Sequence, residues 1–182
     1  ALGLPILRVN GYEADDIIAT VATACTEAKR YCRIFSADKD LMQLVNDTTC
    51  IMKPDKAGGW EKIAANGVEA EWGVPPEKML DMLSLIGDTA DNVPGVQGVG
   101  IKTALKLLLQ YGSLEEIFKH QDEIKGSLGE KIRSGKEMAF FSKKLITLDS
   151  QVPLPVSLND LTIKSLDFAA AARLLYHYGV PS

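Results

Sequence analysis

The fold is decided by residues 33–45, which read RIFSADKDLMQLV. Arg33 to Ser36 predict a short buried strand, and Asp38 to Val45 predict a short helix that begins directly after it. Asp38 therefore follows the carboxyl end of a strand, the edge at which α/β sheets place their binding sites. This stretch predicts an α/β protein with an acidic site at one edge of its sheet.

The segments on both sides extend the same pattern. Apolar residues recur at helical spacing from Glu13 to Lys29, and residues 49–52 predict a second strand. Helix, strand, helix and strand in this order favour parallel neighbours in one sheet. Because a further strand is suggested only by residues 6–9, we expect a small sheet that is incomplete at its N-terminal side.

The chain beyond residue 52 is expected to be mostly helical. No strand of comparable quality follows, and glycine and proline breaks divide the apolar periodicity from Trp60 onward. A closing helix is predicted from Asp167 to Tyr178. The expected fold is thus a parallel-sheet core followed by a helical region.

Composition excludes several classes of protein. The 182 residues are 46% hydrophobic, enough to bury a sizeable core. No apolar run approaches the roughly 20 residues that a membrane helix needs, and the first residues lack the basic and apolar regions of a signal peptide. The cysteines Cys25, Cys32 and Cys50 have no zinc-binding spacing, so we expect reduced thiols in a cytoplasmic protein.

Charge is distributed unevenly along the chain. The net charge is −4, but residues 1–94 hold 9 Lys and Arg against 15 Asp and Glu, whereas residues 95–144 hold 9 against 6. An acidic block is therefore followed by a basic block. Cations in the acidic block and phosphates at the basic block would fit this arrangement.

Three clusters of acidic residues stand out in the acidic block: Glu13-Ala14-Asp15-Asp16, Asp38-Lys39-Asp40 and Asp88-Thr89-Ala90-Asp91. Any one of them alone could simply cap the first turn of a helix. Asp88 and Asp91 are three residues apart and would share a face of a helical turn. If the clusters converge in space, their carboxylates repel one another unless a cation neutralises them.

The ligand chemistry of these clusters favours hard cations. Carboxylate oxygens without His or Cys partners select Mg²⁺ or Mn²⁺, and His120 and His177 lie far from all three clusters in the sequence. Two such ions roughly 4 Å apart would activate a water and stabilise the leaving oxygen of a phosphodiester. The acidic clusters therefore predict metal-assisted phosphoryl transfer to water.

A glycine-rich turn follows the third acidic cluster. It reads GVQGVGIKT at residues 95–103 and opens a helix. Glycines let backbone N–H groups approach an anion, and the helix N-terminus, Lys102 and Thr103 add contacts to phosphate. The order of residues differs from a Walker A loop and from a dinucleotide fingerprint. A turn without a ligand is the alternative, but the adjacent charge blocks favour sequence-independent phosphate binding.

These motifs, in this order, resemble the 5′ nuclease domain of bacterial DNA polymerase I, a group that includes flap endonucleases and phage 5′ exonucleases. The resemblance rests on GYEADDIIAT at residues 11–20, FSADKDLMQLV at 35–45 and LIGDTADNVPGVQGVGIKTA at 85–104. It implies a PIN-like α/β core over residues 1–94. It also implies a helix–three-turn–helix, a form of helix-hairpin-helix, in a helical region over residues 95–182.

The resemblance implies roles for particular residues. The family's metal-site carboxylates match Glu13, Asp15, Asp16, Asp38, Asp40, Asp88 and Asp91. Asp38, Asp15 and Asp88 are the expected catalytic members, with Asp38 central between two Mg²⁺ or Mn²⁺ ions. The expected DNA-binding residues, which would grip duplex phosphates and hold K⁺ through backbone carbonyls, are Gly95, Val96, Gln97, Gly98, Val99, Gly100, Lys102 and Thr103.

The implied reaction is 5′–3′ exonuclease action and cleavage of 5′ flaps, including removal of RNA primers in DNA replication and repair. The expected partners are DNA with a 5′ flap, nick or 5′ end, an RNA primer–DNA hybrid, and a polymerase domain of the same parent chain. We expect a monomer in the bacterial cytoplasm, associated with the nucleoid, with no membrane partner.

One part of the family pattern is missing at the front. In the family, two further aspartates on strands and a basic helical arch precede the stretch equivalent to Gly11, whereas the ten residues before Gly11 contain no acid. Two interpretations follow: a piece of a nuclease, and a non-catalytic module that binds DNA structure. From these residues alone we expect weak metal binding and little cleavage.

Overall fold

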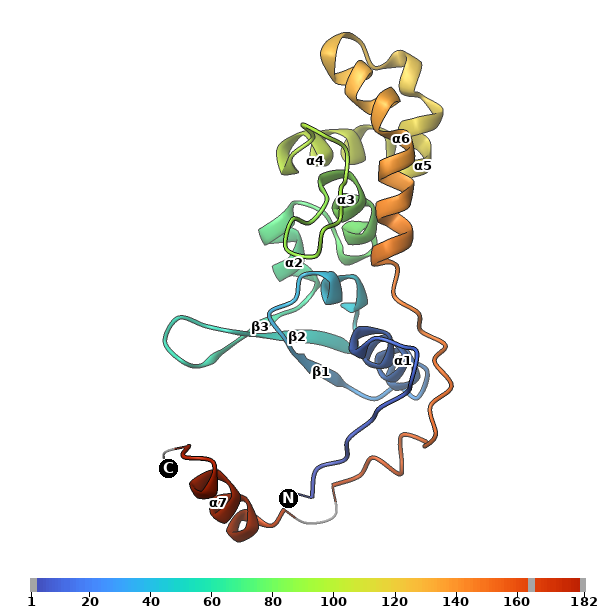
Figure 1. The fold of residues 1–182 in the computed structure, drawn as a ribbon. Helices are drawn as coiled ribbons and strands as arrows, with labels where there is room; N and C mark the ends of the chain where they lie inside the picture. The colour runs from blue at the N-terminus through green and yellow to red at the C-terminus, as the bar shows by residue number, and fades with distance from the viewer. Residues whose placement is uncertain (1–2, 164–165, 181–182) are drawn as a thin grey trace. The chain divides into compact units, whose positions relative to one another are not determined.

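The computed structural model describes residues 3–163 and 166–180 and divides the chain into two compact units. The first unit comprises residues 1–24 and 149–182, and the second comprises residues 25–148. Helix α1 (Ala14–Glu27) begins in the first unit and ends in the second. Figure 1 shows the order of the elements along the chain.

The second unit opens with a three-stranded sheet in the order β1-β2-β3. Strands β1 (Cys32–Phe35) and β2 (Thr49–Pro54) are parallel, with Ile34 opposite Ile51, which confirms the predicted parallel pair. The 3-10 helix η1 (Asp40–Leu44) connects them and buries Leu41 and Met42. The segment that decided the fold therefore forms a strand, an acidic turn and a short helix.

The third strand was not predicted from the sequence. Strand β3 (Trp60–Ile63) pairs antiparallel with β2, whereas residues 6–9 form no strand. The turn between β2 and β3 is closed by Asp55, whose Oδ1 accepts hydrogen bonds from Ala57 N and Gly59 N at 2.8 Å each. Three of the four residues of β3 are exposed, so this hairpin strand lacks the apolar run that marks a buried one.

Helices follow the sheet, as predicted. They are α2 (Ala65–Trp72), η2 (Pro76–Lys78), α3 (Met79–Ile86), α4 (Ile101–Tyr111), α5 (Leu114–Lys119), η3 (Gln121–Glu123) and α6 (Gly126–Ile146). Helix α3 is the centre of this region, because it packs against η1, α4, α5 and α6. Its side chains Met79, Met82, Leu83 and Leu85 are fully buried. An apolar helix wrapped by others on most sides is expected to be buried in this way.

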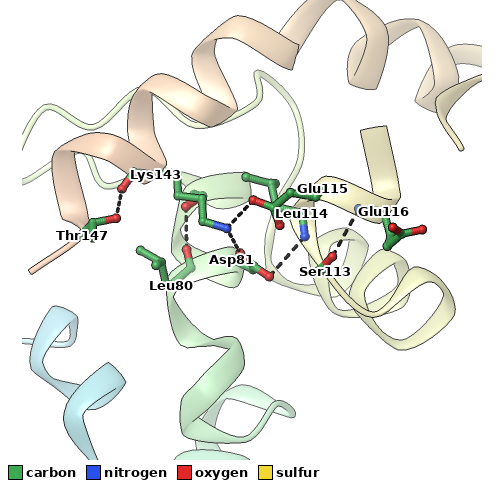
Figure 2. A network of polar contacts seen from close by, with 9 residues as sticks. Leu80, Asp81, Ser113, Leu114, Glu115, Glu116, Lys143 and Thr147 are labelled. Carbon is green, nitrogen blue, oxygen red and sulfur yellow. Dashed lines mark hydrogen bonds and ion pairs between the residues drawn. The ribbon is translucent and has the colours of Figure 1, made fainter. Parts of the chain in front are cut away.

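A polar network fastens α3 to α5 and α6 inside this apolar region (Figure 2). Asp81 is buried, and its Oδ1 accepts a hydrogen bond from Lys143 Nζ at 2.8 Å while its Oδ2 accepts one from Leu114 N at 3.2 Å. Lys143 also pairs with Glu115 at 2.6 Å. Each buried charge in this network has a partner, as a stable buried ion pair requires.

The first unit combines most of α1 with the chain that follows α6. Val152 N donates to Thr20 Oγ1 at 3.0 Å, and Thr20 Oγ1 donates to Asp149 O at 3.3 Å. The predicted closing helix is confirmed as α7 (Phe168–His177), with Asp167 as its N-cap accepting from Ala170 N. In the part of the chain that the structure describes, no helix is long and apolar enough to cross a membrane.

Candidate metal centre and nucleic-acid interface

The turn after β1 presents two aspartates in a defined geometry. Asp38 N donates to Ser36 Oγ at 3.0 Å, and Asp40 N donates to Asp38 Oδ1 at 2.9 Å. Asp38 thus keeps one carboxylate oxygen on the backbone at the start of η1. Because Ser36 N also bonds to Met52 O at 3.2 Å, the turn is fastened to the sheet edge.

The turn after α3 presents the other two. Gly87 ends α3 with a positive φ of 73°, and the backbones of Asp88 and Val93 then exchange two hydrogen bonds of 2.8 and 2.7 Å. Asp88 and Asp91 interact across this closed turn, and the interaction raises the pKa of Asp91. The spacing therefore brings them together, but on a turn and not on the helical face that the sequence suggested.

The two turns form one electrostatic cluster. Burial raises the pKa of Asp40 to about 6, and the neighbouring charges of Asp38, Asp88 and Asp91 add to the rise. Asp40 Oδ1 is buried and has no hydrogen-bond partner among the described residues. A buried, unpartnered carboxylate oxygen beside three further carboxylates is what a cation would neutralise, so the donor set fits a hard divalent ion.

One basic side chain enters this cluster. Lys39 Nζ forms an ion pair with Asp88 Oδ2, and this bond is the main cause that holds the pKa of Asp88 below its ordinary value. Asp88 is only 8% exposed. No role for Lys39 was predicted, although a lysine between two aspartates is a signal that could have suggested one.

The four aspartates do not assemble into a closed ligand shell. In residues 3–163 and 166–180, no group of three or more His, Cys, Asp or Glu side chains is arranged to hold a metal ion. Asp88 faces Lys39 and Asp91, and Asp38 faces the backbone of η1. The cluster is therefore close in space but is oriented toward protein partners.

The first acidic cluster lies at the N-terminus of α1 in the other unit. Asp16 Oδ2 accepts from Glu13 N at 3.3 Å, and Asp16 Oδ1 accepts from Asp149 N at 2.9 Å. The contact with Glu13 N is the helix-capping contact expected of an acidic residue in the first turn of a helix. The convergence of Glu13, Asp15 and Asp16 with the four aspartates of the second unit stays a prediction.

The glycine turn is held in place by hydrogen bonds from its buried residues to α3 and α6. Gly95 N donates to Ser142 Oγ of α6 at 2.9 Å, and Val96 N donates to Leu85 O of α3 at 2.8 Å. Gly95 has a φ of 61°, and a Cβ there would meet the backbone of Gly87. The glycine turn and the Asp88 turn therefore cross in backbone contact, which only residues without a side chain allow.

The accessible part of the glycine turn faces a groove. Gln97, Gly98, Gly100 and Lys102 are exposed, while Val96 and Val99 are buried. A groove of about 530 Å³ lies between this turn and α6, and Lys131 at its edge donates to Gly98 O at 3.3 Å. Lys102 and Lys106 of α4 line a second groove. The surface here offers cations and backbone groups, as phosphate binding requires.

Residues 1–169 match two adjoining family descriptions. Residues 1–73 match the 5′–3′ exonuclease N-terminal resolvase-like domain, and residues 74–169 match the 5′–3′ exonuclease C-terminal SAM fold. The chain belongs to the 5′–3′ exonuclease family. The predicted family and the α/β core followed by a helical region are thereby confirmed.

Relatives of this chain are mostly much longer proteins. It is 43% identical to DNA polymerase I of Treponema pallidum (strain Nichols) over 99% of this chain but 18% of that protein. It is 39% identical to a 5′–3′ exonuclease of Aquifex aeolicus (strain VF5) over 91% of this chain and 55% of that protein. The chain therefore spans only part of the relatives that it matches.

Solved structures share the fold of this chain. T5 5′-exonuclease with bound zinc superposes with a TM-score of 0.69 at 21% identity, covering 78% of this chain and 52% of that one. The catalytic core of Rad2 in complex with a DNA substrate gives 0.52 at 16% identity, covering 82% and 51%. At these identities the likeness supports the fold.

Proposed function

We propose that this chain provides metal-dependent 5′ nuclease chemistry: hydrolysis of phosphodiesters at 5′ ends and 5′ flaps of DNA and RNA primers. The observation that carries this proposal is the buried, unpartnered Oδ1 of Asp40 within a cluster of four aspartates. Such a group is costly to bury unless a cation compensates it. When bound, two Mg²⁺ or Mn²⁺ ions would activate a water and stabilise the leaving oxygen.

The chain's own residues would divide the work between two surfaces. Asp38, Asp40, Asp88 and Asp91 would hold the ions together with Glu13, Asp15 and Asp16, and the catalytic members would be Asp38, Asp15 and Asp88. The phosphate surface would be the glycine turn, where Gln97, Gly98, Gly100, Lys102 and Thr103 meet the duplex and carbonyls of the turn hold K⁺. The backbone contact between Gly87 and Gly95 would fix the distance between the phosphate-binding turn and the metal centre where the phosphodiester is cleaved.

The setting of this activity is also proposed. Relatives that are DNA polymerase I, and a Rad2 core solved with a DNA substrate, suggest DNA with a flap, nick or 5′ end as the partner and a polymerase domain in the same parent chain. We assign the nuclease core to residues 1–94 and the DNA-gripping region to residues 95–182. A monomer in the bacterial cytoplasm at the nucleoid fits the three free thiols.

A second function is favoured by one observation. The glycine turn is fully formed, whereas the aspartates of the described residues do not form a metal-holding group. The chain could thus act as a module that binds DNA structure without cutting it. The two functions differ in whether the aspartate cluster binds metal and supports cleavage of DNA, or the chain only binds DNA.

Cleavage of a labelled 5′-flap DNA in Mg²⁺, with Asp38→Asn as the matched variant, separates the two. The nuclease proposal predicts a Mg²⁺-dependent product that is weak for these residues alone and absent in Asp38→Asn. Duplex binding with no product in either protein would instead support the binding module.

The phosphate surface has its own test. Lys102→Ala is expected to weaken duplex binding and to reduce the slope of log affinity against log salt by about 1, because one phosphate contact is lost. Lys53→Ala on β2, which pairs with Glu71, is the matched control and should change neither quantity. An unchanged slope in Lys102→Ala would remove Lys102 from the surface.

A further inference from the structure

Lys39 occupies an unusual place in the carboxylate cluster. It lies between Asp38 and Asp40 in the sequence, at the start of η1, yet its ammonium group reaches the turn after α3 and pairs with Asp88. Both oxygens of Asp88 are thereby engaged, because Ala90 N donates to Oδ1 at 2.9 Å. The pair joins the two acidic turns that would make up the metal centre.

The burial of the two partners makes this pair more than a surface contact. The side chain of Asp88 is 8% exposed and that of Lys39 is 29% exposed. Removing a partner from a buried carboxylate leaves an uncompensated charge, whereas exposed pairs are nearly neutral in energy. Lys39 therefore matters for the cluster when no other cation is present.

Lys39 neutralises only part of the negative charge of the cluster. It compensates Asp88, but Asp40 Oδ1 is buried without a partner among the described residues, and the negative charge of Asp91 still lies beside Asp88. One ammonium group facing four aspartates satisfies only part of the cluster. The rest is available to a cation of higher charge.

We propose that Lys39 is a built-in counter-ion that holds Asp88 in the metal-free protein and must leave it when a divalent cation binds. This inference rests on the proposed metal centre. Lys39 has two consequences: it keeps the repelling aspartates together before the metal arrives, and it competes with the metal for Asp88. A metal site that is free to bind only part of the time, because Lys39 occupies Asp88 for the rest, binds its ion with proportionally lower apparent affinity.

Calorimetric Mn²⁺ titration of the 182-residue chain, of Lys39→Gln and of Asp38→Asn tests the proposal. Lys39→Gln should bind Mn²⁺ about fivefold more tightly, the factor that corresponds to a partly exposed ion pair worth about 1 kcal/mol. In EDTA the same variant should melt at a lower temperature than the parent, and saturating Mn²⁺ should remove that difference. A merely structural lysine would lower the melting temperature equally in both conditions.

Matched variants control for charge and exposure. Lys53→Gln removes a lysine of similar exposure, 33%, that pairs with Glu71 at 2.9 Å in the same unit, and it should leave Mn²⁺ affinity unchanged. Lys39→Arg keeps the charge and should bind Mn²⁺ like the parent. Equal tightening in Lys39→Gln and Lys53→Gln would mean that net charge alone acts, and would overturn the proposal.

The outcomes separate this inference from the proposed function. If the parent binds Mn²⁺, Asp38→Asn does not, and Lys39→Gln binds no more tightly than the parent, the metal centre stands and the role of Lys39 is wrong. If neither the parent nor Lys39→Gln binds Mn²⁺, both proposals are wrong. If Lys39→Gln fails to fold, ¹³C-methylated lysines of the parent give the answer: the Lys39 signal should shift on saturation with Mg²⁺, and a signal that does not move overturns the inference.

Discussion

Two aspartates, one in α3 and one in the turn after it, are buried to a similar extent and each pairs with a lysine, yet their surroundings differ. Asp81 and Asp88 are 7% and 8% exposed. Around Asp81, Lys143 and Leu114 N use both carboxylate oxygens, and Lys143 is shared with Glu115 (Figure 2). Around Asp88, one lysine faces four aspartates, and a buried oxygen of Asp40 has no partner among the described residues. A buried carboxylate whose two oxygens both have donors belongs to a structural network, whereas a buried oxygen without a donor among several aspartates marks a site for a cation.

The largest effect that would sharpen this contrast is expected from Lys143→Met. It leaves buried Asp81 and the neighbouring Glu115 without a cation, so the free energy of unfolding should fall by about 2–3 kcal/mol after allowance for the partial exposure of Lys143. Urea unfolding in EDTA and in Mn²⁺ measures it, and the loss should be the same in both. A loss that Mn²⁺ reverses would mean that the Asp81 network also binds metal.

A smaller effect of opposite sign is expected from Asp40→Asn. The substitution removes one of four repelling charges and leaves a neutral amide at the buried position, so the metal-free chain should be stabilised by about 1 kcal/mol. Urea unfolding in EDTA checks the sign, and Mn²⁺ titration should show weaker binding. Destabilisation in EDTA would mean that Asp40, like Asp81, stabilises the fold through contacts within the protein.

The smallest effect is expected in the dependence of stability on pH. The Lys143 ammonium group, bonded to Glu115, holds the pKa of Glu115 below its ordinary value of 4.5. A lowered pKa in the folded state contributes stability above the unfolded value, and this contribution is lost as the pH falls through the folded value. The stability difference between the parent and Glu115→Gln should therefore be present at pH 7 and shrink below about pH 4.5. A difference that does not change with pH would remove the ion pair as its cause.

The sequence predicted the parts of this comparison that depend on local pattern. The strand and acidic turn around Asp38 follow from an apolar run that ends in carboxylates, and α7 follows from its periodicity and the cap at Asp167. Closely spaced glycines indicated a turn with close approach to a phosphate; the structure has the turn, with Gly95 against the backbone of Gly87, and phosphate binding stays a prediction. Each of these features is encoded within a few neighbouring residues.

The missed features depend on contacts between distant segments. Lys39 and Asp88, and Asp81 and Lys143, are far apart in the sequence, so no spacing rule links them. Strand β3 was missed because its residues are mostly exposed and only its pairing with β2 defines it. The Asp88–Asp91 contact was predicted on a helix but is made by a turn, because α3 ends at Ile86.

Paramagnetic broadening of amide resonances by substoichiometric Mn²⁺ distinguishes the two aspartate networks, because it is strongest for residues near the bound ion. The signals of Asp38, Asp40, Asp88 and Asp91 should broaden first, while those of Asp81, Leu114 and Lys143 stay sharp at the same Mn²⁺ concentration. Addition of Mg²⁺ should restore the broadened signals. Broadening that is absent, or that affects both aspartate networks alike, would contradict the assignment of a cation site to the cluster around Asp40.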